Sequence, residues 1–460
     1  MRFSEIVQAV GGSLTCKDPS LMARGVSTDS RTIQAGNLFV ALTGENFDGH
    51  NFIQDAISKG ASGVMISKHL DVGSNIPVIH SNDTLYALGE LARSWRRRFD
   101  IPLIAITGSV GKTTTKEMAA SILSAHFNPI LKTEGNLNNL IGLPQTLFQL
   151  DPIHKVAVVE MGMSMRGEIR RLAEIASPNI AAITNVSPVH LEFLKTIEQV
   201  AQAKGELLEK LSEADIAVLN ADDPRVSAMR LGRSFRTVMF GEAPDVDVRI
   251  EKIILRGFEG TQVILSVSGK PLDLELSIPG KFHVHNAAAA TAIGYALNLP
   301  FDAIVKGLGD FRPAAMRTRI YDLFGIKIID DSYNASPRSM DAAISLLMEL
   351  MSHSGGRGIA VLADMLELGD ESVAAHRRLG RHVAKAGVHE LYLFGSMAQK
   401  VAEGALEEKM PDEAVHIYEN HAQIVAMLRE VSKKGDVILI KGSRGMRMER
   451  VVRGLRGEVV

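Results

Sequence analysis

The sequence predicts an α/β protein of three domains, and three observations support this prediction. Short apolar, β-branched strands alternate with helical segments along nearly the whole chain, as expected of strand–helix units built around parallel sheets. The chain has 460 residues, too many for one hydrophobic core. Candidate boundaries near residues 82 and 311 divide it into expected domains at 1–82, 83–311 and 312–460. The central domain is expected to hold a parallel sheet with a β insertion, and the last a Rossmann-like sheet.

Composition and charge argue against several classes of protein. With 46% hydrophobic and 23% charged residues, the composition is that of a globular protein. The formal net charge of −2 argues against a nucleic-acid partner, which needs a basic surface. The single cysteine, Cys16, excludes an internal disulfide and fits a reducing compartment. No apolar run approaches membrane-spanning length, and the first residues lack the apolar core of a signal peptide. We therefore expect a cytoplasmic protein with no membrane insertion.

The first expected domain combines short strands with two polar loops. A strand at Leu38–Leu42, a helix at Phe52–Lys59 and a strand at Val64–Ile66 are expected. Loops at strand ends in such domains often hold ligands, but the residue types found here also form turns and helix caps. Both interpretations stay open for the candidate binding residues of the two loops, which are Asp29, Ser30, Arg31, Asp48 and His50.

The segment Ile101–Lys116, IPLIAITGSVGKTTTK, predicts a phosphate-binding loop. An apolar run typical of a buried strand leads into a glycine-containing loop and then into a helix that opens with lysine and threonine. Glycine lets the backbone approach a phosphate, and free N–H groups at a helix start attract negative charge. The spacing is shorter than in the usual P-loop, G-x-x-G-K-T. The segment predicts a nucleoside triphosphate site formed by Gly108, Ser109, Val110, Gly111, Lys112, Thr113 and Thr114.

Two segments after this loop contain candidate ligands. An asparagine-rich loop at 133–144 offers many amide donors and acceptors. The strand Val156–Glu160 ends in a carboxylate, and at the carboxyl end of a parallel strand beside a P-loop a carboxylate suits Mg²⁺. Capping of the next helix is the alternative for Glu160.

Two further residues have ambiguous roles. His190 follows a strand that ends at Asn185, and it is a candidate metal ligand, with a core residue or a cap as the alternative. Lys204 lies in a helix that begins near Thr196, where most lysines face solvent.

The rest of the chain continues the α/β pattern. Residues 235–278 alternate apolar and polar, which predicts an antiparallel β insertion. An alanine-rich helix follows at Ala287–Leu297, and the polar residues of the last domain lie mainly in loops at 330–337, 364–369 and 441–444. Strands of a second sheet are expected at Ile326–Ile329, Ile359–Leu362, Leu391–Phe394, Val415–Tyr418 and Val437–Ile440.

Nine segments follow one another along the chain in this order: TGSVGKTTTK, TEGNLNNLIGLP, VVEMG, TNVSPVHLE, QAKGE, NADDP, IDDSYNASPRSM, ADMLELG and KGSR. They occur in the same order in the Mur ligases, cytoplasmic enzymes that extend the peptide of a cell-wall precursor, and the chain resembles that family. The resemblance spans all three domains. Within the family, the asparagine loop and the segment Asp331–Pro337 resemble the member that joins D-alanyl-D-alanine to UDP-N-acetylmuramoyl-tripeptide. This resemblance implies ATP-dependent amide formation through an acyl phosphate, which yields the pentapeptide precursor of peptidoglycan.

The resemblance also implies roles for the candidate residues. The first domain would bind the UDP-sugar, the central domain ATP and the last domain the incoming dipeptide. Two Mg²⁺ ions are expected, one held by Thr113 and Glu160 and one by His190 and Lys204, with Lys204 carbamylated as in related ligases. The expected catalytic residues are Lys112, Glu160, His190 and Lys204. ATP would also contact Asn286, Arg317 and Asp331, and the substrates would contact Asn136, Asn138, Asn139, Asn334, Ser443 and Arg444.

Two positions depart from the family pattern. Phe282 and His283 stand where many relatives have a His-Asn pair, and stacking of Phe282 on adenine would compensate. Ser336 replaces the usual asparagine, so no role is transferred to it.

The sequence leaves two alternatives to this function. One is a sibling ligase that adds the third amino acid, or glutamate to folate; the asparagine loop and the DSYN segment disfavour it, and the sibling's DNPR pattern is absent. The other is a P-loop ATPase switch without ligation. Against it, Glu160 stands where such proteins usually have aspartate, and no arginine-finger motif is identifiable. A monomer is expected.

Overall fold

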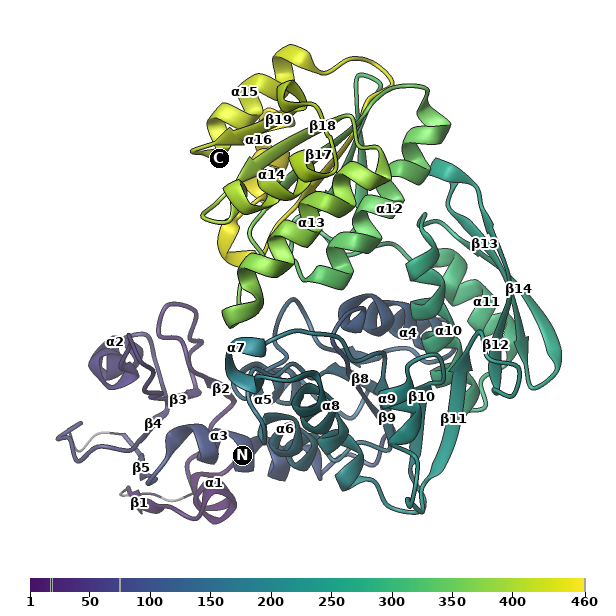
Figure 1. Cartoon of the computed structure of the whole chain (residues 1–460). Coiled ribbons are helices and arrows are strands. Elements are labelled where there is room, and N and C mark those ends of the chain that lie inside the picture. The colour runs from purple at the N-terminus through teal and green to yellow at the C-terminus, as the bar shows by residue number, and fades with distance from the viewer. Residues whose placement is uncertain (17, 19, 74–75, 459–460) are drawn as a thin grey trace.

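Three α/β domains follow one another along the chain (Figure 1). The computed structural model describes the whole chain except residues 17, 19, 74–75 and 459–460. Its sheets have five, nine and six strands, which confirms the predicted fold class. Within the described residues, none of the helices combines the length and apolar character needed to cross a membrane.

The first domain has a five-stranded sheet in the order β1-β5-β4-β3-β2, parallel except for β1. Alternate residues of the strands face opposite cores, so that Met65 packs on one side and Val64 and Ile66 on the other. The elements are α1 (Phe3–Val10), β1 (Ser13–Thr15), β2 (Gly25–Ser27), β3 (Asn37–Val40), η1 (Gly49–Phe52), α2 (Ile53–Ser58), β4 (Gly63–Ile66) and β5 (Val78–His80).

Helix α3 (Thr84–Arg96) connects the first two domains. Asp83 caps it by accepting hydrogen bonds from the backbone N–H groups of Leu85 and Tyr86. Leu88 belongs to the core of the first domain and Ala92 to the core of the second. The helix therefore packs against both domains, and the exact boundary near residue 82 stays a prediction.

The central domain has a nine-stranded sheet in the order β14-β13-β12-β11-β10-β9-β6-β8-β7. Helices α4, α10 and α11 cover one face, and α5, α6 and α8 cover the other together with α3. The parallel strands are β6 (Leu103–Thr107), β7 (Leu131–Lys132), β8 (Ala157–Glu160), β9 (Ile180–Ile183), β10 (Ile216–Asn220) and β11 (Arg236–Gly241). The helices are α4 (Lys112–His126), α5 (Gly142–Leu147), α6 (Glu168–Ala176), α7 (Leu191–Leu194), α8 (Ile197–Gly205), η2 (Glu206–Lys210), α9 (Pro224–Ala228), α10 (Lys281–Ala296) and α11 (Phe301–Asp310).

The β insertion is shorter than the predicted range 235–278. Strand β11 pairs in parallel with β10 and so belongs to the parallel part of the sheet. The antiparallel part consists of β12 (Val248–Leu255), β13 (Thr261–Val267) and β14 (Lys270–Leu276). The short helix η3 (Gly257–Glu259) connects β12 to β13. An alternating pattern identifies strands but not the direction of their partners, which explains the difference.

The last domain has a six-stranded sheet in the order β15-β16-β20-β17-β18-β19. All pairs are parallel except β15 with β16, and the edge strand β15 was not predicted. The strands are β15 (Arg319–Leu323), β16 (Ile326–Asp331), β17 (Gly358–Ala363), β18 (Glu390–Phe394), β19 (Val415–Tyr418) and β20 (Val437–Lys441). The helices are α12 (Pro337–Ser354), η4 (Gly369–Glu371), α13 (Ser372–Ala386), α14 (Ala398–Glu407), η5 (Asp412–Ala414), α15 (His421–Val431), η6 (Arg444–Met446) and α16 (Glu449–Leu455).

The last domain contacts the central domain at the β insertion and again at α7. Phe258 of η3 packs against the core of the last domain, and the Lys327 amine lies 5.3 Å from the centroid of its ring. At the other contact, α7 lies against η4, just before α13, and Figure 1 shows these segments facing each other across the two domains.

Candidate active site

The loop between β6 and α4 has a backbone suited to phosphate. Gly108 and Gly111 have φ angles of +151° and +88°, which other residues rarely adopt. A Cβ on Gly108 would lie 1.9 Å from Thr184 Oγ1, so the position requires glycine. Lys112 begins α4, and its amine donates to the Gly108 carbonyl at 2.8 Å. The P-loop predicted from the sequence is therefore formed as a strand, a loop and a helix.

Residues that follow β9 hold this loop in shape. The Thr184 hydroxyl donates to the Val110 carbonyl at 2.7 Å, and the Asn185 side chain accepts from the Val110 N–H at 3.0 Å. The Ser109 hydroxyl donates to the Ser187 carbonyl at 3.1 Å. These hydrogen bonds satisfy polar groups of the loop with partners from the residues that follow β9.

The predicted Mg²⁺ pair Thr113 and Glu160 is brought together. The Thr113 hydroxyl donates to Glu160 Oε2 at 2.7 Å, and the Asn138 amide donates to Oε1 at 2.8 Å. The carboxylate is buried. A hydroxyl and a carboxylate at the mouth of the P-loop are oxygen donors of the kind that Mg²⁺ prefers.

Burial affects the charge of Lys112. Removal from water lowers the pKa of Lys112 below its usual value, while Glu160 opposes the shift and Arg317 adds to it. Arg317 belongs to the last domain, so both domains contribute to the electrostatics of the loop.

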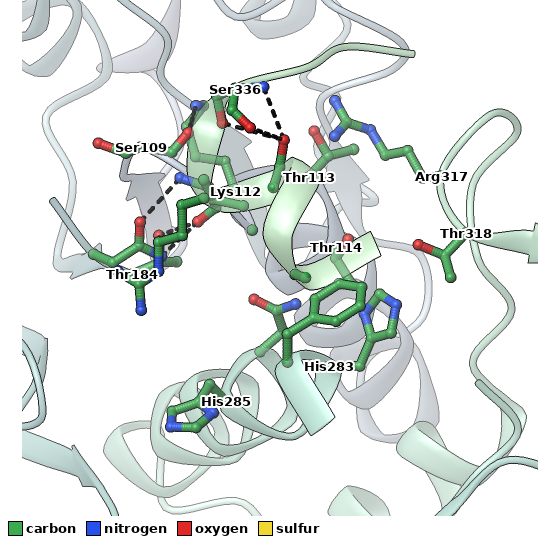
Figure 2. A pocket seen from close by; sticks show the side chains of 18 of the residues that line it. Ser109, Lys112, Thr113, Thr114, Thr184, His283, His285, Arg317, Thr318 and Ser336 are labelled. Atoms are coloured by element: carbon green, nitrogen blue, oxygen red, sulfur yellow. Dashed lines mark hydrogen bonds between the residues drawn. The ribbon is translucent and has the colours of Figure 1, made fainter. Parts of the chain in front are cut away.

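A cavity of about 190 Å³ lies between the central and last domains. Figure 2 shows Thr114 and His283 of the central domain opposite Arg317 and Thr318 of the last. Its lining includes the predicted nucleotide residues Ser109, Val110, Gly111, Lys112, Thr113, Thr114, Asn286, Arg317 and Asp331, and also Asn334. Gly108, the first residue of the loop, is not part of this lining.

The last domain holds its side of the cavity with a network centred on Asp331. One oxygen of Asp331 accepts from the Thr318 N–H at 3.1 Å, and the other pairs with the Lys441 amine. The Arg317 guanidinium lies over the Tyr333 ring, 4.1 Å from its centroid. Lys441 and Tyr333 were not assigned from the sequence, although Lys441 ends an apolar strand, a position where ligand-binding residues gather.

The helix α10 brings Phe282, His283 and Asn286 to the same cavity. Asn286 approaches the loop so closely that a Cβ on Gly111 would lie 2.3 Å from its Oδ1. His283 is 1% exposed, and neither ring nitrogen has a hydrogen-bond partner within the described residues. Burial lowers the pKa of His283 to about 3, with Asp331 opposing the shift.

The predicted second metal pair has a different environment. Lys204 is buried, and none of the described carboxylates lies within ion-pair distance of it. Burial and the charge of Lys112 lower the pKa of Lys204 well below its usual value. His190 Nδ1 instead contacts Glu367 Oε2 of the last domain at 2.6 Å. Among the described residues no group of three or more His, Cys, Asp or Glu side chains is arranged to hold a metal.

Several predicted substrate residues stabilise loops. Asn139 lies just before α5, and its side-chain oxygen accepts from the Ile141 and Gly142 N–H groups at 3.1 and 2.9 Å. Ser443 is buried and accepts from the Leu366 N–H at 2.9 Å. Asn136 is exposed, and the guanidinium of Arg444 lies 5.8 Å from the centroid of the Tyr333 ring.

Ser336, to which no role was transferred, is the N-cap of α12. Its backbone N–H donates to Ser339 Oγ at 2.9 Å. A serine in this position is a common helix start.

The predicted residues of the first domain form two internal clusters away from the cavity. Arg31 forms a two-pronged ion pair with Asp29, whose pKa it holds at about 2. His50 is buried, with Nδ1 2.6 Å from Asp48 and Nε2 accepting from the Ser67 N–H at 3.1 Å. The backbone of Ser30 accepts a hydrogen bond from Lys59. Turn and cap functions are therefore present at these residues, and ligand binding by them stays a prediction.

The fold and the site together define a P-loop α/β protein whose phosphate loop faces a second α/β domain across a cavity. Three family descriptions match the chain: "Mur ligase family, catalytic domain" at residues 23–96, "Mur ligase middle domain" at 106–294 and "Mur ligase, glutamate ligase domain" at 316–444. The chain belongs to the Mur ligase family, which confirms the resemblance drawn from the motifs.

Individual relatives are similar over nearly their full length. The UDP-N-acetylmuramoyl-tripeptide–D-alanyl-D-alanine ligase of Bacillus subtilis (strain 168) is 35% identical over 433 residues, which cover 94% of this chain and 93% of that protein. A crystal structure of MurF from Acinetobacter baumannii matches with a TM-score of 0.89 and 30% identity, covering 99% of each chain. The MurF ligase of Thermotoga maritima in complex with ADP matches with a TM-score of 0.84 and 29% identity, covering 95% of this chain and 98% of that one.

Proposed function

We propose that this protein is an ATP-dependent ligase that joins D-alanyl-D-alanine to UDP-N-acetylmuramoyl-tripeptide and so forms the pentapeptide precursor of peptidoglycan. The similarity to the Bacillus subtilis ligase of that name supports this substrate pair over those of sibling ligases. The observation that supports it best is the cavity lined by the P-loop and by Arg317 of the last domain, in which Thr113 of the loop is hydrogen-bonded to Glu160.

ATP binding is supported by the P-loop and by the ADP complex of the Thermotoga maritima relative. The loop N–H groups and Lys112 would hold the phosphates. Phe282 would stack on the base, and Asn286, Arg317 and Asp331 would contact the nucleoside and phosphate from both sides of the cavity.

The residues present fit one Mg²⁺ well. Thr113 Oγ1 and the Glu160 carboxylate are oxygen donors already in contact, and phosphate and water oxygens would complete the shell. When bound, the ion would neutralise charge on the transferring phosphate.

A second Mg²⁺ at His190 and Lys204 requires a change at the lysine, because an ammonium group repels a cation and Mg²⁺ prefers oxygen. The lowered pKa of Lys204 favours the neutral amine, which attacks CO₂ and releases a proton to form a carbamate. That carbamate would supply oxygen ligands and an anion near Lys112. Labelled bicarbonate should yield a carbamate resonance in the NMR spectrum of the protein that disappears in Lys204→Ala.

The chain needs no nucleophilic side chain for this chemistry. The terminal carboxylate of the tripeptide attacks the γ-phosphorus of ATP, and ADP leaves. The amine of D-alanyl-D-alanine then attacks the acyl phosphate, and phosphate leaves. The protein contributes positioning and cationic groups, chiefly Lys112 and Arg317, and the facing domains would keep water from the acyl phosphate.

The remaining assignments complete the proposal. The polar loops of the first domain would bind the UDP-sugar, with Asp29, Ser30, Arg31, Asp48 and His50 nearby. The loops with Asn136, Asn138, Asn334 and Arg444 would contact the peptide substrates. We also infer a cytoplasmic location and a monomer.

The test is a phosphate-release assay with four mixtures: ATP alone, ATP with either peptide partner, and ATP with both. Phosphate release is expected to need both partners and to match the amount of UDP-linked pentapeptide found by mass spectrometry. Equal ATP consumption in all four mixtures without a joined product would refute the proposed function.

A further inference from the structure

A loop of the last domain contacts the central domain beside the P-loop. Glu367 Oε2 lies 2.6 Å from His190 Nδ1, although the two residues are 177 positions apart. The Glu192 N–H donates to the Glu367 carbonyl at 3.4 Å. Gly369 packs so closely on α7 that a Cβ there would lie 3.1 Å from the Glu192 Cα. The contact therefore includes backbone as well as the ion pair.

The last domain shapes this loop before it reaches α7. Buried Asp364 accepts from the N–H groups of Ser396 and Met397 at 2.8 and 3.0 Å. The Met365 N–H donates to His376 Nε2 at 2.9 Å, and the Leu366 N–H to Ser443. Three consecutive residues are thus fixed, and Glu367 is presented by a rigid support.

Both partners of the ion pair have left-handed backbones. Glu367 has φ of +62° and His190 has φ of +54°, which is costly for residues other than glycine and occurs mainly where the surroundings impose it at functional sites. His190 also follows closely after Ser187, which is bonded to Ser109 of the P-loop.

The geometry of the pair matches that of a supported metal ligand. When Nδ1–H of a histidine donates to a carboxylate, the tautomer is fixed and the Nε2 lone pair is left free for a cation. The carboxylate also fixes the rotation of the ring. Here the carboxylate comes from another domain, so the ring is held only while that domain touches α7.

We propose that Glu367 is a positioning residue that acts through His190, and that it links divalent-cation binding at His190 to docking of the last domain on α7. This inference rests on the proposed function, because it takes His190 as a cation ligand. If docking improves cation binding, the cation must favour docking by the same factor.

The ion pair does not hold the domains together by itself. Glu367 has a side chain 48% exposed, and exposed ion pairs contribute little to stability. The contact of Phe258 with the core of the last domain is separate. Removal of the carboxylate should therefore leave the domains attached at the β insertion and loosen only the contact at α7.

The experiment compares full-length wild type with Glu367→Ala, Glu367→Gln and the control Glu371→Ala. Glu371 is an exposed acid of the same loop with no ion pair among the described residues, so its removal reproduces the charge change alone. Manganese binding with ADP present is measured by electron paramagnetic resonance. The distance between the domains is measured by fluorescence transfer in a Cys16→Ser background with Glu213→Cys and Glu413→Cys for labelling.

Glu367→Ala is expected to weaken one manganese site about 10-fold or more, the range seen when such supporting groups are lost. It should also abolish the change in interdomain distance that manganese causes in wild type. Glu367→Gln, which keeps a hydrogen-bond acceptor, should recover most of the affinity, and Glu371→Ala should match wild type. In assays, Glu367→Ala should raise the Mg²⁺ concentration for half-maximal rate and leave kcat at saturating Mg²⁺ nearly unchanged.

Unchanged manganese affinity and interdomain distance in folded Glu367→Ala would overturn the proposal. The variant His190→Ala separates the positioning role of Glu367 from the cation-ligand role of His190. If it weakens manganese binding while Glu367→Ala does not, only the positioning role fails. If it leaves manganese binding unchanged, His190 is not a cation ligand, so the second metal site and the positioning role of Glu367 both fail, while the ligase function is decided separately by the phosphate-release assay.

Discussion

At the scale of single residues, the P-loop lysine is the group on which turnover should depend most. Lys112 lies at the start of α4 and donates to the loop carbonyls rather than to a carboxylate. Its charge is therefore available to a phosphate once the amine turns outward. Since the hydrogen bonds of its amine go only to carbonyls of the loop itself, its removal should affect the reaction and not the fold.

We expect Lys112→Ala to lower the rate of phosphate release at least about 100-fold, as loss of one transition-state donor typically does, and to keep the wild-type unfolding temperature. The control is Lys252→Ala on the exposed face of β12, which should keep full activity. A Lys112→Ala protein that ligates at the wild-type rate would remove the lysine from the mechanism.

His283 offers a test that does not need substrate. Its pKa in the folded protein is about 3, below the usual value near 6.5 in an unfolded chain. The unfolded state therefore binds a proton more readily, so the stability that neutral His283 allows is present above about pH 6.5 and decreases as the pH falls from there toward 3.

Accordingly, the free energy of unfolding of wild type should fall more steeply between about pH 6.5 and pH 4 than that of His283→Asn, by at most about 1.4 kcal/mol per pH unit. Urea denaturation at several pH values measures this slope. The exposed His69→Asn should keep the wild-type slope. Identical slopes in wild type and His283→Asn would mean that the buried ring finds a partner or water in solution.

At the scale of elements, the sequence predicts features whose residues are close together along the chain, and it misses those that depend on distant segments. The P-loop was predictable because its strand, glycines and helix start are contiguous. The Thr113–Glu160 contact was predictable because β6 and β8 are parallel and their carboxyl ends meet at one edge. The His190–Glu367 pair and the partner direction of β11 depend on distant segments, which periodicity does not record.

The P-loop as an element should fail if its first glycine is replaced. In Gly108→Ala the new Cβ would meet Thr184 Oγ1, and the φ of +151° is strained for alanine. We expect the affinity for a fluorescent ADP analogue to fall at least about 10-fold. The loop must move to make room for the new Cβ, and it then loses the hydrogen bonds that the residues after β9 make with it. Gly309→Ala is the matched control, because nothing lies within 4 Å of a Cβ there and its φ is not positive. Equal affinities in the two variants would contradict a rigid, preformed loop.

At the scale of the whole molecule, the candidate nucleotide cavity is shared by two domains while the first domain lies outside it. A ligand in that cavity should therefore stabilise the central and last domains together. At 100 times its dissociation constant, a ligand that binds only the folded state contributes about 2.7 kcal/mol. The described contacts of the first domain with the central domain include α3, the Gln145–Thr28 hydrogen bond and the packing of Phe148 on the core of the first domain, and none of these lines the cavity.

Hydrogen exchange with and without ADP and Mg²⁺ measures this distribution. Protection is expected to rise in residues 106–114, 281–286 and 317–334, and to stay unchanged in β1 to β5. Lys112→Ala at the same ADP concentration serves as the control, because weak binding should remove the gain in both domains at once. Protection confined to residues 106–114 and 281–286, with none at 317–334, would mean that the last domain does not close on the nucleotide in solution, and that Arg317 and Asp331 act only after the peptide substrates arrive.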